Sequence, residues 1–400
     1  MRTNFLSAIL LFSCLAACKK SAGPPRPIIT GFSPGNGATG AVVIIYGHFD
    51  STLQQESVYF NGDQAKILSP SDSQIIVTAP AGVTTGKITV TVDNLSSTTD
   101  SDFVVLAGAW TQMANRPLAP SGSFNIRLGI GFAIGNYGYM GFGTDNGTDY
   151  GDLYQYDPAS NSWTTMPSMG VPMEDLISMV IGDKAYVGIG DSRNLDSYSN
   201  QFYEFDPSTQ TWTRKADFPG ASRENAFAFS AGGLGYVALG YGSQAFGYRD
   251  VWQYDPSSDT WTQKNNFPAN GDVPNLGTAF SPDNQVGYIV GTYTPANSRT
   301  YWEVVWKYDP TTDNWTQMHN LPTQGMAYPS SMVINGTAYV LGGGQECWSY
   351  DAAADSWTQL AFFGFRDAGS AFAINGIGYF GMGDQRFSDL QYIDFWKFTP

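Results

Sequence analysis

Charged residues recur at one position ahead of a series of tyrosines. Each of these tyrosines follows Gly or Ala, and they are Tyr139, Tyr186, Tyr236, Tyr288, Tyr339 and Tyr379. Twelve or thirteen residues before them stand Arg127, Glu174, Arg223, Asn275, Met326 and Arg366. Guanidinium groups offer forked N–H donors that pair with a carboxylate or with adjacent hydroxyls. The pattern predicts a cationic binding site for an acidic group or for sugar hydroxyls. A structural alternative, in which these residues form salt bridges and cap backbone carbonyls, stays open.

The segments that follow the same tyrosines are rich in aromatic and polar residues. The candidate binding residues there are Tyr241, Tyr248, Trp302, Asp384 and Arg386, and Asp191 and Arg193 lie in an equivalent segment. Aromatic rings stack on the C–H faces of sugars, while Asp and Arg side chains bind the hydroxyls. These segments therefore fit a carbohydrate platform. The alternative is that the aromatic rings wedge loops together.

Two other kinds of chemistry have little support. The stretch Asp145–Asp149 is rich in oxygen ligands but lacks the spacing of an EF-hand, so we expect a solvated turn and no metal site. The chain has two histidines, His48 and His319. Histidine-cluster metal catalysis and a Ser-His-Asp triad are therefore not expected. No cofactor is predicted, and Glu174 is the candidate catalytic residue if the protein is an enzyme.

A repeated stretch organises the part of the chain that holds these residues. It consists of an aromatic residue, Asp, then Pro or Ala, with a Trp six residues after the Asp. The five Asp–Trp pairs are Asp157 and Trp163, Asp206 and Trp212, Asp255 and Trp261, Asp309 and Trp315, and Asp351 and Trp357. An Asp-Pro pair favours a tight turn, because Pro fixes its own φ angle and the Asp side chain accepts hydrogen bonds from the nearby backbone. Together with the tyrosine-bearing segments, each period holds four short strands.

Four-stranded units of this length resemble the kelch repeat of β-propellers. The resemblance covers residues 107–400 and is weaker at the Gly doublet, which is intact only near Gly342-Gly343. Trp110 begins a strand of the fourth type in the unit, but the first three strands of that unit do not precede it. The final unit of the chain has its first three strands and lacks the fourth. We therefore predict an all-β fold with six blades, closed by an N-terminal strand. The candidate residues would then surround the mouth of a central channel.

Residues 27–106 form a separate region of short strands. Alternating or apolar runs such as Val42–Tyr46 and Lys87–Val92 lie between turn signals such as Asn61-Gly62. The segment from Ile29-Thr-Gly-Phe-Ser-Pro-Gly35 through Val58-Tyr-Phe-Asn-Gly62 resembles an IPT/TIG domain. This implies a small immunoglobulin-like β-sandwich, of a type that serves as spacer or interaction module.

The N-terminus has the features of a secretory signal. A basic start and an apolar stretch precede Leu15-Ala16-Ala17-Cys18, which resembles the lipobox of bacterial lipoproteins. The resemblance implies a signal peptide at 1–17, lipidation of Cys18 and a tether at 18–26. Lys19 in place of Asp favours the outer membrane of a bacterial envelope, with the face undetermined. In the mature chain Cys347 would be the remaining cysteine, which excludes an internal disulfide.

The overall charge argues against nucleic acid as a partner. The formal net charge is −15, and no basic run exceeds a pair of residues. We expect a lipid-anchored binding or scaffold protein with a glycan or a protein as partner. One alternative is a mutarotase or isomerase, because the six-bladed kelch sialic acid mutarotases use a carboxylate and Arg at the channel mouth, which Glu174 with an arginine would imitate. The other is a purely protein-binding propeller. Kelch-type copper radical oxidases, the galactose oxidase group, use paired histidines that this chain lacks.

Overall fold

The computed structural model describes residues 26–49, 56–118, 126–145, 147–193, 197–242, 247–268, 273–293, 302–323, 326, 328–344, 346–364, 366–384 and 393–400. The chain divides into two compact units, Met1–Val105 and Leu106–Pro400. Within the described ranges the regular elements are β-strands, and none is an α-helix. The predicted all-β class is confirmed.

The first unit is a sandwich of two sheets. One sheet has the order β1 (Ile28–Ser33), β3 (Val42–His48), β7 (Gln74–Thr78) and β6 (Lys66–Pro70). The other has the order β2 (Asn36–Gly37), β9 (Leu95–Val105), β8 (Gly86–Val92), β4 (Glu56–Phe60) and β5 (Asp63–Gln64).

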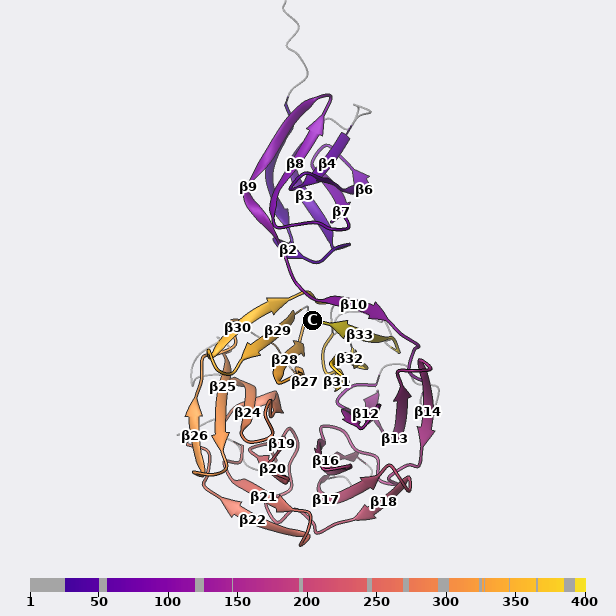
Figure 1. Ribbon diagram of the computed structural model, residues 1–400, viewed down its shortest axis with the longest axis vertical. Helices are drawn as coiled ribbons and strands as arrows, with labels where there is room; N and C mark the ends of the chain where they lie inside the picture. The colour runs from indigo at the N-terminus through magenta and orange to yellow at the C-terminus, as the bar shows by residue number, and fades with distance from the viewer. Residues whose placement is uncertain are drawn as a thin grey trace, which may run out of the picture. The chain divides into compact units, whose positions relative to one another are not determined.

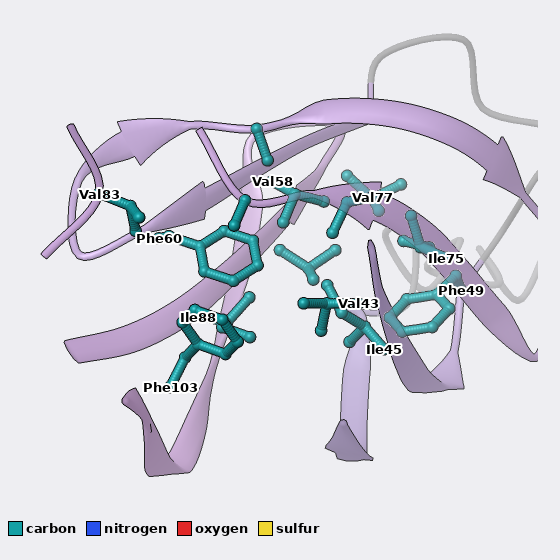
Figure 2. Close-up of a cluster of buried hydrophobic side chains, with 14 residues drawn as sticks. Val43, Ile45, Phe49, Val58, Phe60, Ile75, Val77, Val83, Ile88 and Phe103 are labelled. Atoms are coloured by element: carbon teal, nitrogen blue, oxygen red, sulfur yellow. The ribbon is translucent and has the colours of Figure 1, made fainter. Parts of the chain in front are cut away.

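Alternate residues of these strands build its core, because successive side chains on a strand point to opposite faces. Val43 and Ile45 of β3 and Ile88 of β8 are fully buried in one cluster (Figure 2). The rings of Phe60 and Phe103 meet edge to face, with centroids 5.0 Å apart. The sandwich is the immunoglobulin-like fold that the alternating runs predict.

The second unit consists of six four-stranded sheets arranged as blades around a centre (Figure 1). Blade 1 consists of β11 (Ile130–Ile134), β12 (Tyr137–Asp145), β13 (Thr148–Asp157) and β14 (Ser162–Met166). Blade 2 consists of β15 (Ile177–Ile181), β16 (Lys184–Ser192), β17 (Ser197–Asp206) and β18 (Thr211–Arg214). Blade 3 consists of β19 (Phe227–Ala231), β20 (Leu234–Ala238), β21 (Val251–Asp255) and β22 (Thr260–Lys264). Blades 4 and 5 are β23 (Asn275–Phe280), β24 (Gly287–Tyr293), β25 (Trp302–Asp309), β26 (Asn314–Gln317); and β27 (Ser330–Ile334), β28 (Thr337–Gly342), β29 (Glu346–Asp351), β30 (Ser356–Leu360).

Blade 6 joins the two ends of this unit. It has the order β31 (Ser370–Ile374), β32 (Ile377–Gly381), β33 (Phe395–Thr399) and β10 (Ala109–Gln112). Strand β10 pairs antiparallel with β33, with Trp110 opposite Phe398. The predicted six blades and their closure by an N-terminal strand are confirmed. Closure covers the edge that β33 would otherwise expose.

The repeated aromatic residues hold neighbouring blades together. The tyrosine of each second strand packs against an aromatic residue in the third strand of the next blade. The pairs are Tyr139–Phe205, Tyr186–Tyr254, Tyr236–Tyr308, Tyr288–Tyr350, Tyr339–Phe398 and Tyr379–Tyr156. The series closes on itself, so the same contact is made at every blade boundary. These contacts explain why tyrosine recurs at the same position of each repeat in the sequence.

The Asp and Trp columns serve the turns and the outer strands. Asp255 accepts a hydrogen bond from the backbone N–H of Ser257 at 2.8 Å, as an Asx turn requires. The indole N–H of Trp261 donates to the carbonyl of Ala216 in the connection from the preceding blade, at 3.0 Å. Between them Asp259, at φ 53°, accepts from the Tyr254 hydroxyl at 2.7 Å. The motif therefore links each hairpin to its neighbour.

Candidate functional site: the mouth of the propeller channel

Residues with left-handed backbone conformation stand at or just before the start of the innermost strands of the blades. Their φ angles lie between 46° and 58°, and they are Leu128, Asp175, Asn225, Leu276, Tyr328 and Ala368. Backbone hydrogen bonds link them across blade boundaries, for example Asp175 N–H to the Leu128 carbonyl at 3.0 Å. We call this ring the throat. Because its backbone is fixed by neighbouring blades, the side chains beside it are held in defined positions.

The residues before four of the six throat positions begin the site. Arg127, Glu174, Glu224 and Asp367 form isolated backbone bridges with Thr144, Asp191, Tyr241 and Asp384, respectively, at the ends of the second strands. A cavity of about 250 Å³ lies among these side chains. We call it the mouth cavity, and it is lined by Arg127, Leu128, Glu174, Asp175, Asp191, Arg193, Glu224, Tyr328, Asp367, Ala368 and Asp384.

Further cavities continue from the mouth cavity along the channel. One of about 110 Å³ shares Leu128 and Asp175 with it, and others of about 200 and 280 Å³ follow. Gly, Ala and Ser residues of the inner strands, such as Gly131, Ser178 and Ala228, line the later ones. Charge is thus concentrated at the mouth end of this series.

The prediction that Arg223 lies at the mouth is wrong. Its side chain is fully buried within blade 3 and forms a forked ion pair with Asp250, with N–O distances of 2.7 and 2.9 Å. The same guanidinium donates to the Leu239 carbonyl at 2.7 Å and lies over the rings of Phe218 and Tyr248. Every part of the group is used within the fold, so Arg223 is a structural residue.

Arg366 occupies the equivalent place in blade 6, and the prediction for it is wrong for the same reason. Its guanidinium is buried, pairs with Asp394 and lies over Phe363. Trp396 donates to the same Asp394 carboxylate at 2.7 Å, as Trp252 does to Asp250 in blade 3. The two blades therefore contain the same Arg–Asp–Trp arrangement.

A one-residue difference in spacing explains both errors. Arg223 and Arg366 stand 13 residues before Tyr236 and Tyr379, whereas Arg127 and Glu174 stand 12 before theirs. A uniform count of 12 gives Glu224 and Asp367, which are the residues that line the mouth cavity. A uniform spacing of 12 residues is therefore the sequence signal that identifies Glu224 and Asp367 as residues of the mouth. The mouth is consequently acidic, with six carboxylates and two arginines, and not the cationic ring that the sequence predicts.

Arg127 and Glu174 do lie at the mouth, as predicted. Arg127 is half exposed and pairs with the predicted site residue Asp384 at 3.4 Å. Glu174 is buried, accepts a hydrogen bond from Arg193 Nε at 2.8 Å and forms an ion pair with Arg193 Nη2 at 2.7 Å. Arg193 also lies 3.5 Å from the buried carboxylate of Asp149. Both arginines of the mouth are therefore engaged by acids of the same site.

The other predicted residues have different positions. The Tyr241 hydroxyl donates to the Val273 carbonyl at 3.2 Å, and Tyr248 covers Arg223. Asn275 pairs with Thr292 in blade 4, and Met326 is buried. Trp302 is known only by its place in β25, and Arg386 and Cys18 lie outside the described residues. Within the described ranges, no group of three or more His, Cys, Asp or Glu side chains is arranged to hold a metal ion.

Three carboxyl groups of the mouth have raised pKa values. Burial is the largest cause for Glu174, Asp175 and Glu224. The charges of Glu224 and Glu174 raise the pKa of Asp175 further, and those of Asp191 and Glu174 act on Glu224. The hydrogen bond from Arg193 opposes the shift at Glu174. The cluster therefore keeps protons at a higher pH than free carboxyl groups do.

This cluster should destabilise the propeller, and Asp175→Asn tests that. Because the pKa of Asp175 is higher in the folded chain, its contribution to stability is lost as the pH rises through that folded pKa. Asparagine removes the charge and accepts the left-handed backbone, as Asn225 does in blade 3. At about pH 8 we expect the free energy of unfolding to rise by on the order of 1 kcal/mol, the equivalent of one pKa unit.

Urea unfolding followed by tryptophan fluorescence measures this change in the propeller alone, because all 11 tryptophans follow Val105. The gain is expected to be smaller at about pH 5, closer to the usual pKa of Asp. An equal gain at both pH values, or a loss at the higher one, would contradict the assignment of a charge penalty to Asp175.

Comparison with known proteins identifies the first unit. Residues 27–105 match the model of the IPT/TIG domain. The first unit is an IPT/TIG domain. The TIG domain covers a minority of the chain, so it does not assign a family to the propeller. Among the described residues no helix has the length and apolarity needed to cross a membrane.

The propeller is similar to kelch-repeat proteins and to solved propeller structures. A putative F-box/kelch-repeat protein of Arabidopsis thaliana is 31% identical over 101 residues, which are 25% of this chain and 26% of that protein. This chain therefore spans about a quarter of that relative. The structure of a protein named YjhT has a TM-score of 0.58 at 15% identity and covers 70% of this chain and 95% of its own.

A second solved structure covers more of the chain. A protein of unknown function from Bacteroides thetaiotaomicron has a TM-score of 0.51 at 14% identity, covering 94% of this chain and 99% of its own. At these identities the two structures support the fold alone. The chain is thus a kelch-like β-propeller preceded by a TIG domain.

Proposed function

We propose that the propeller binds a small polar ligand, of the carbohydrate class, in the mouth cavity. The observation that carries the proposal is a concave cavity of about 250 Å³ lined by eight charged side chains, four of which stand at equivalent blade positions. Ligand sites are concave, with a few fixed polar groups that set orientation. Carboxyl groups with raised pKa values can donate as well as accept hydrogen bonds, which suits the hydroxyls of a sugar.

The acidic mouth narrows the ligand class that the sequence suggests. Six carboxylates against two arginines repel acidic sugars, so neutral or cationic sugars fit better. A propeller that binds proteins through an apolar mouth is less well supported. Within the described part of the propeller, Leu118 and Tyr137 are the strongly exposed large apolar residues, and neither lines the mouth cavity.

A glycan array tests the proposal. The chain from Ser21 onward should bind a set of neutral or amino sugars, and the Glu174→Gln/Glu224→Gln double variant should lose that binding. The matched control is Asp183→Asn, at an exposed position in the turn between β15 and β16. Binding that survives in the double variant would move the site away from the mouth, and no binding by any of the three would overturn the proposal.

A second candidate function is mutarotation of a sugar. Glu174 favours it, because this carboxyl group is buried, has a raised pKa and is oriented by a hydrogen bond and an ion pair with Arg193. Such a group can give a proton to the ring oxygen as the C1–O5 bond breaks, while a second carboxylate of the mouth takes the proton of the anomeric hydroxyl; both protons return when the ring closes on the other face of C1. General acid–base catalysis contributes about 10²–10⁴ in rate.

Glu174→Gln is therefore expected to slow anomer interconversion by at least about 100-fold. Exchange spectroscopy by NMR on the sugars that the array identifies measures this rate. Asp183→Asn, at the exposed position in the turn between β15 and β16, is the control and should keep the rate. A Glu174→Gln variant as fast as the unmodified chain would remove this carboxyl group from the mechanism and leave a binding protein.

We further propose that the protein is anchored in a bacterial outer membrane through lipid on Cys18. The lipobox-like Leu15-Ala16-Ala17-Cys18 and the Pro-rich stretch after it support this. Cys18→Ser removes the thiol that would be acylated, so the protein should move from the membrane fraction to the soluble fraction after cell lysis. Fractionation with detection by immunoblot measures the shift. Continued sedimentation of Cys18→Ser with membranes would contradict the anchor.

A further inference from the structure

We infer that the ligand of the mouth cavity carries a protonated amine, which makes amino sugars with free amino groups the expected class. This inference rests on the proposed carbohydrate site and deepens it. It comes from three carboxylates of the mouth cavity with which no described lysine or arginine forms an ion pair, although Arg127 and Arg193 act on two of them over a longer distance.

The arginines of the mouth do not neutralise this group. Arg127 pairs with Asp384, and Arg193 pairs with Glu174 and Asp149. Besides Asp367, three further carboxylates line the cavity: Asp175, Asp191 and Glu224. Among the described residues, none of these three side chains accepts a hydrogen bond or forms an ion pair. The site therefore has an excess of negative charge that its own residues do not satisfy.

Asp175 gives independent support at the bottom of the cavity. It belongs to the throat and lines both the mouth cavity and the cavity below it. Burial is the largest cause of its raised pKa, and the charges of Glu224, Glu174 and Asp191 raise that pKa further, whereas Arg127 lowers it. A carboxylate that is partly removed from water and surrounded by other carboxylates is expensive to maintain. A cation bound from solution would supply the missing partner at this point.

The spacing of the acids indicates an organic cation. The described acidic side chains do not come together closely enough in threes to hold one metal ion. An ammonium group has three N–H donors and sits on a molecule that can extend across the cavity. Asp175 and Glu224 are placed to accept from the ammonium group, while Arg127 and Arg193 at the rim are placed to bind hydroxyls of the same sugar. Tyr328 adds an aromatic ring to the lining.

Calorimetry with a matched pair of sugars tests the inference. Chitosan tetramer has free amines, and chitin tetramer has the same backbone with acetylated, neutral nitrogens. At about 0.15 M salt, we expect chitosan tetramer to bind at least about tenfold more tightly. Asp175→Asn and Glu224→Gln should each weaken chitosan binding by about tenfold or more, since each removes a charge facing the amine. Asp183→Asn, the remote control, should bind as the unmodified chain does.

The outcomes separate the inference from the proposed function. If chitin binds as tightly as chitosan, or if Asp175→Asn and Glu224→Gln leave chitosan binding unchanged, the amine inference is overturned while a carbohydrate site remains. Tetralysine, a cation without a sugar ring, should bind more weakly than chitosan tetramer, and equal binding would overturn the amino-sugar class. Failure of both tetramers also overturns the inference, and the glycan array then decides whether any carbohydrate site exists.

Discussion

Replacing Arg223 by Met is expected to lower the free energy of unfolding of the propeller by about 3 kcal/mol. The substitution keeps most of the side-chain volume but leaves Asp250 without the forked ion pair in a partly buried place. Removing one member of a buried ion pair typically costs about 3–5 kcal/mol. The lower figure applies because Asp250 keeps some exposure and the hydrogen bond from Trp252.

Arg127→Met is the matched control, because Arg127 was predicted from the same pattern. Its pair with Asp384 is half exposed on the Arg side and 3.4 Å long, so the loss should stay within about 1 kcal/mol. The double variant Arg223→Met/Asp250→Asn should recover part of the loss, since the neutral amide still accepts from Trp252. Urea unfolding followed by tryptophan fluorescence measures all three. Equal losses for Arg223→Met and Arg127→Met would contradict the distinction between a blade residue and a mouth residue.

The second large effect is expected for Trp110→Ala, in the strand that closes the ring. Trp110 packs on Phe362, Phe363 and Phe398, and its indole N–H donates to the Ala361 carbonyl at 2.7 Å. Large-to-small changes of this kind cost about 3–5 kcal/mol when the ring is buried. Because Trp110 is partly exposed, we expect about 3 kcal/mol, together with local opening of blade 6.

Hydrogen exchange distinguishes this opening from a general loss of stability. Strand β10 is attached to β33 by pairing and packing, since the chain does not connect the two directly. The amides of β33 that pair with β10 should therefore exchange at least about tenfold faster in Trp110→Ala than in the unmodified chain. Trp212→Ala, in the continuous blade 2, should leave β33 protected. Uniformly faster exchange in both variants would contradict a special role for the closing strand.

The blade architecture was predictable from the sequence because its contacts repeat. Each blade boundary uses the same pair of aromatic positions, as Tyr186–Tyr254 and Tyr236–Tyr308 illustrate. Each hairpin uses the same Asp-capped turn. Repeated contacts select the same residue types at regular spacing, so the columns of the sequence report the fold directly. The unpaired Trp110 strand likewise predicted how the ring closes.

The mouth was harder to predict because it depends on single-residue register. Successive side chains of an extended chain point to opposite sides. The side chain of Arg223 is therefore buried inside a blade, whereas that of the next residue, Glu224, lines the mouth cavity. This one step changes the expected site from cationic to acidic. The partners of Arg193 come from two different blades, and loop geometry that brings them together has no regular spacing to reveal it.

A crystal structure of the chain from Ser21 onward, grown with chitosan tetramer, tests the central claim most directly. We expect density for the sugar in the mouth cavity, with an amine nitrogen within about 3.2 Å of the Asp175 or Glu224 carboxylate. Hydroxyls of the same sugar should contact Arg127 or Arg193. Sugar bound on the TIG domain or on the outer strands of the blades, with the mouth cavity free of it, would contradict the assignment of the mouth as the ligand site.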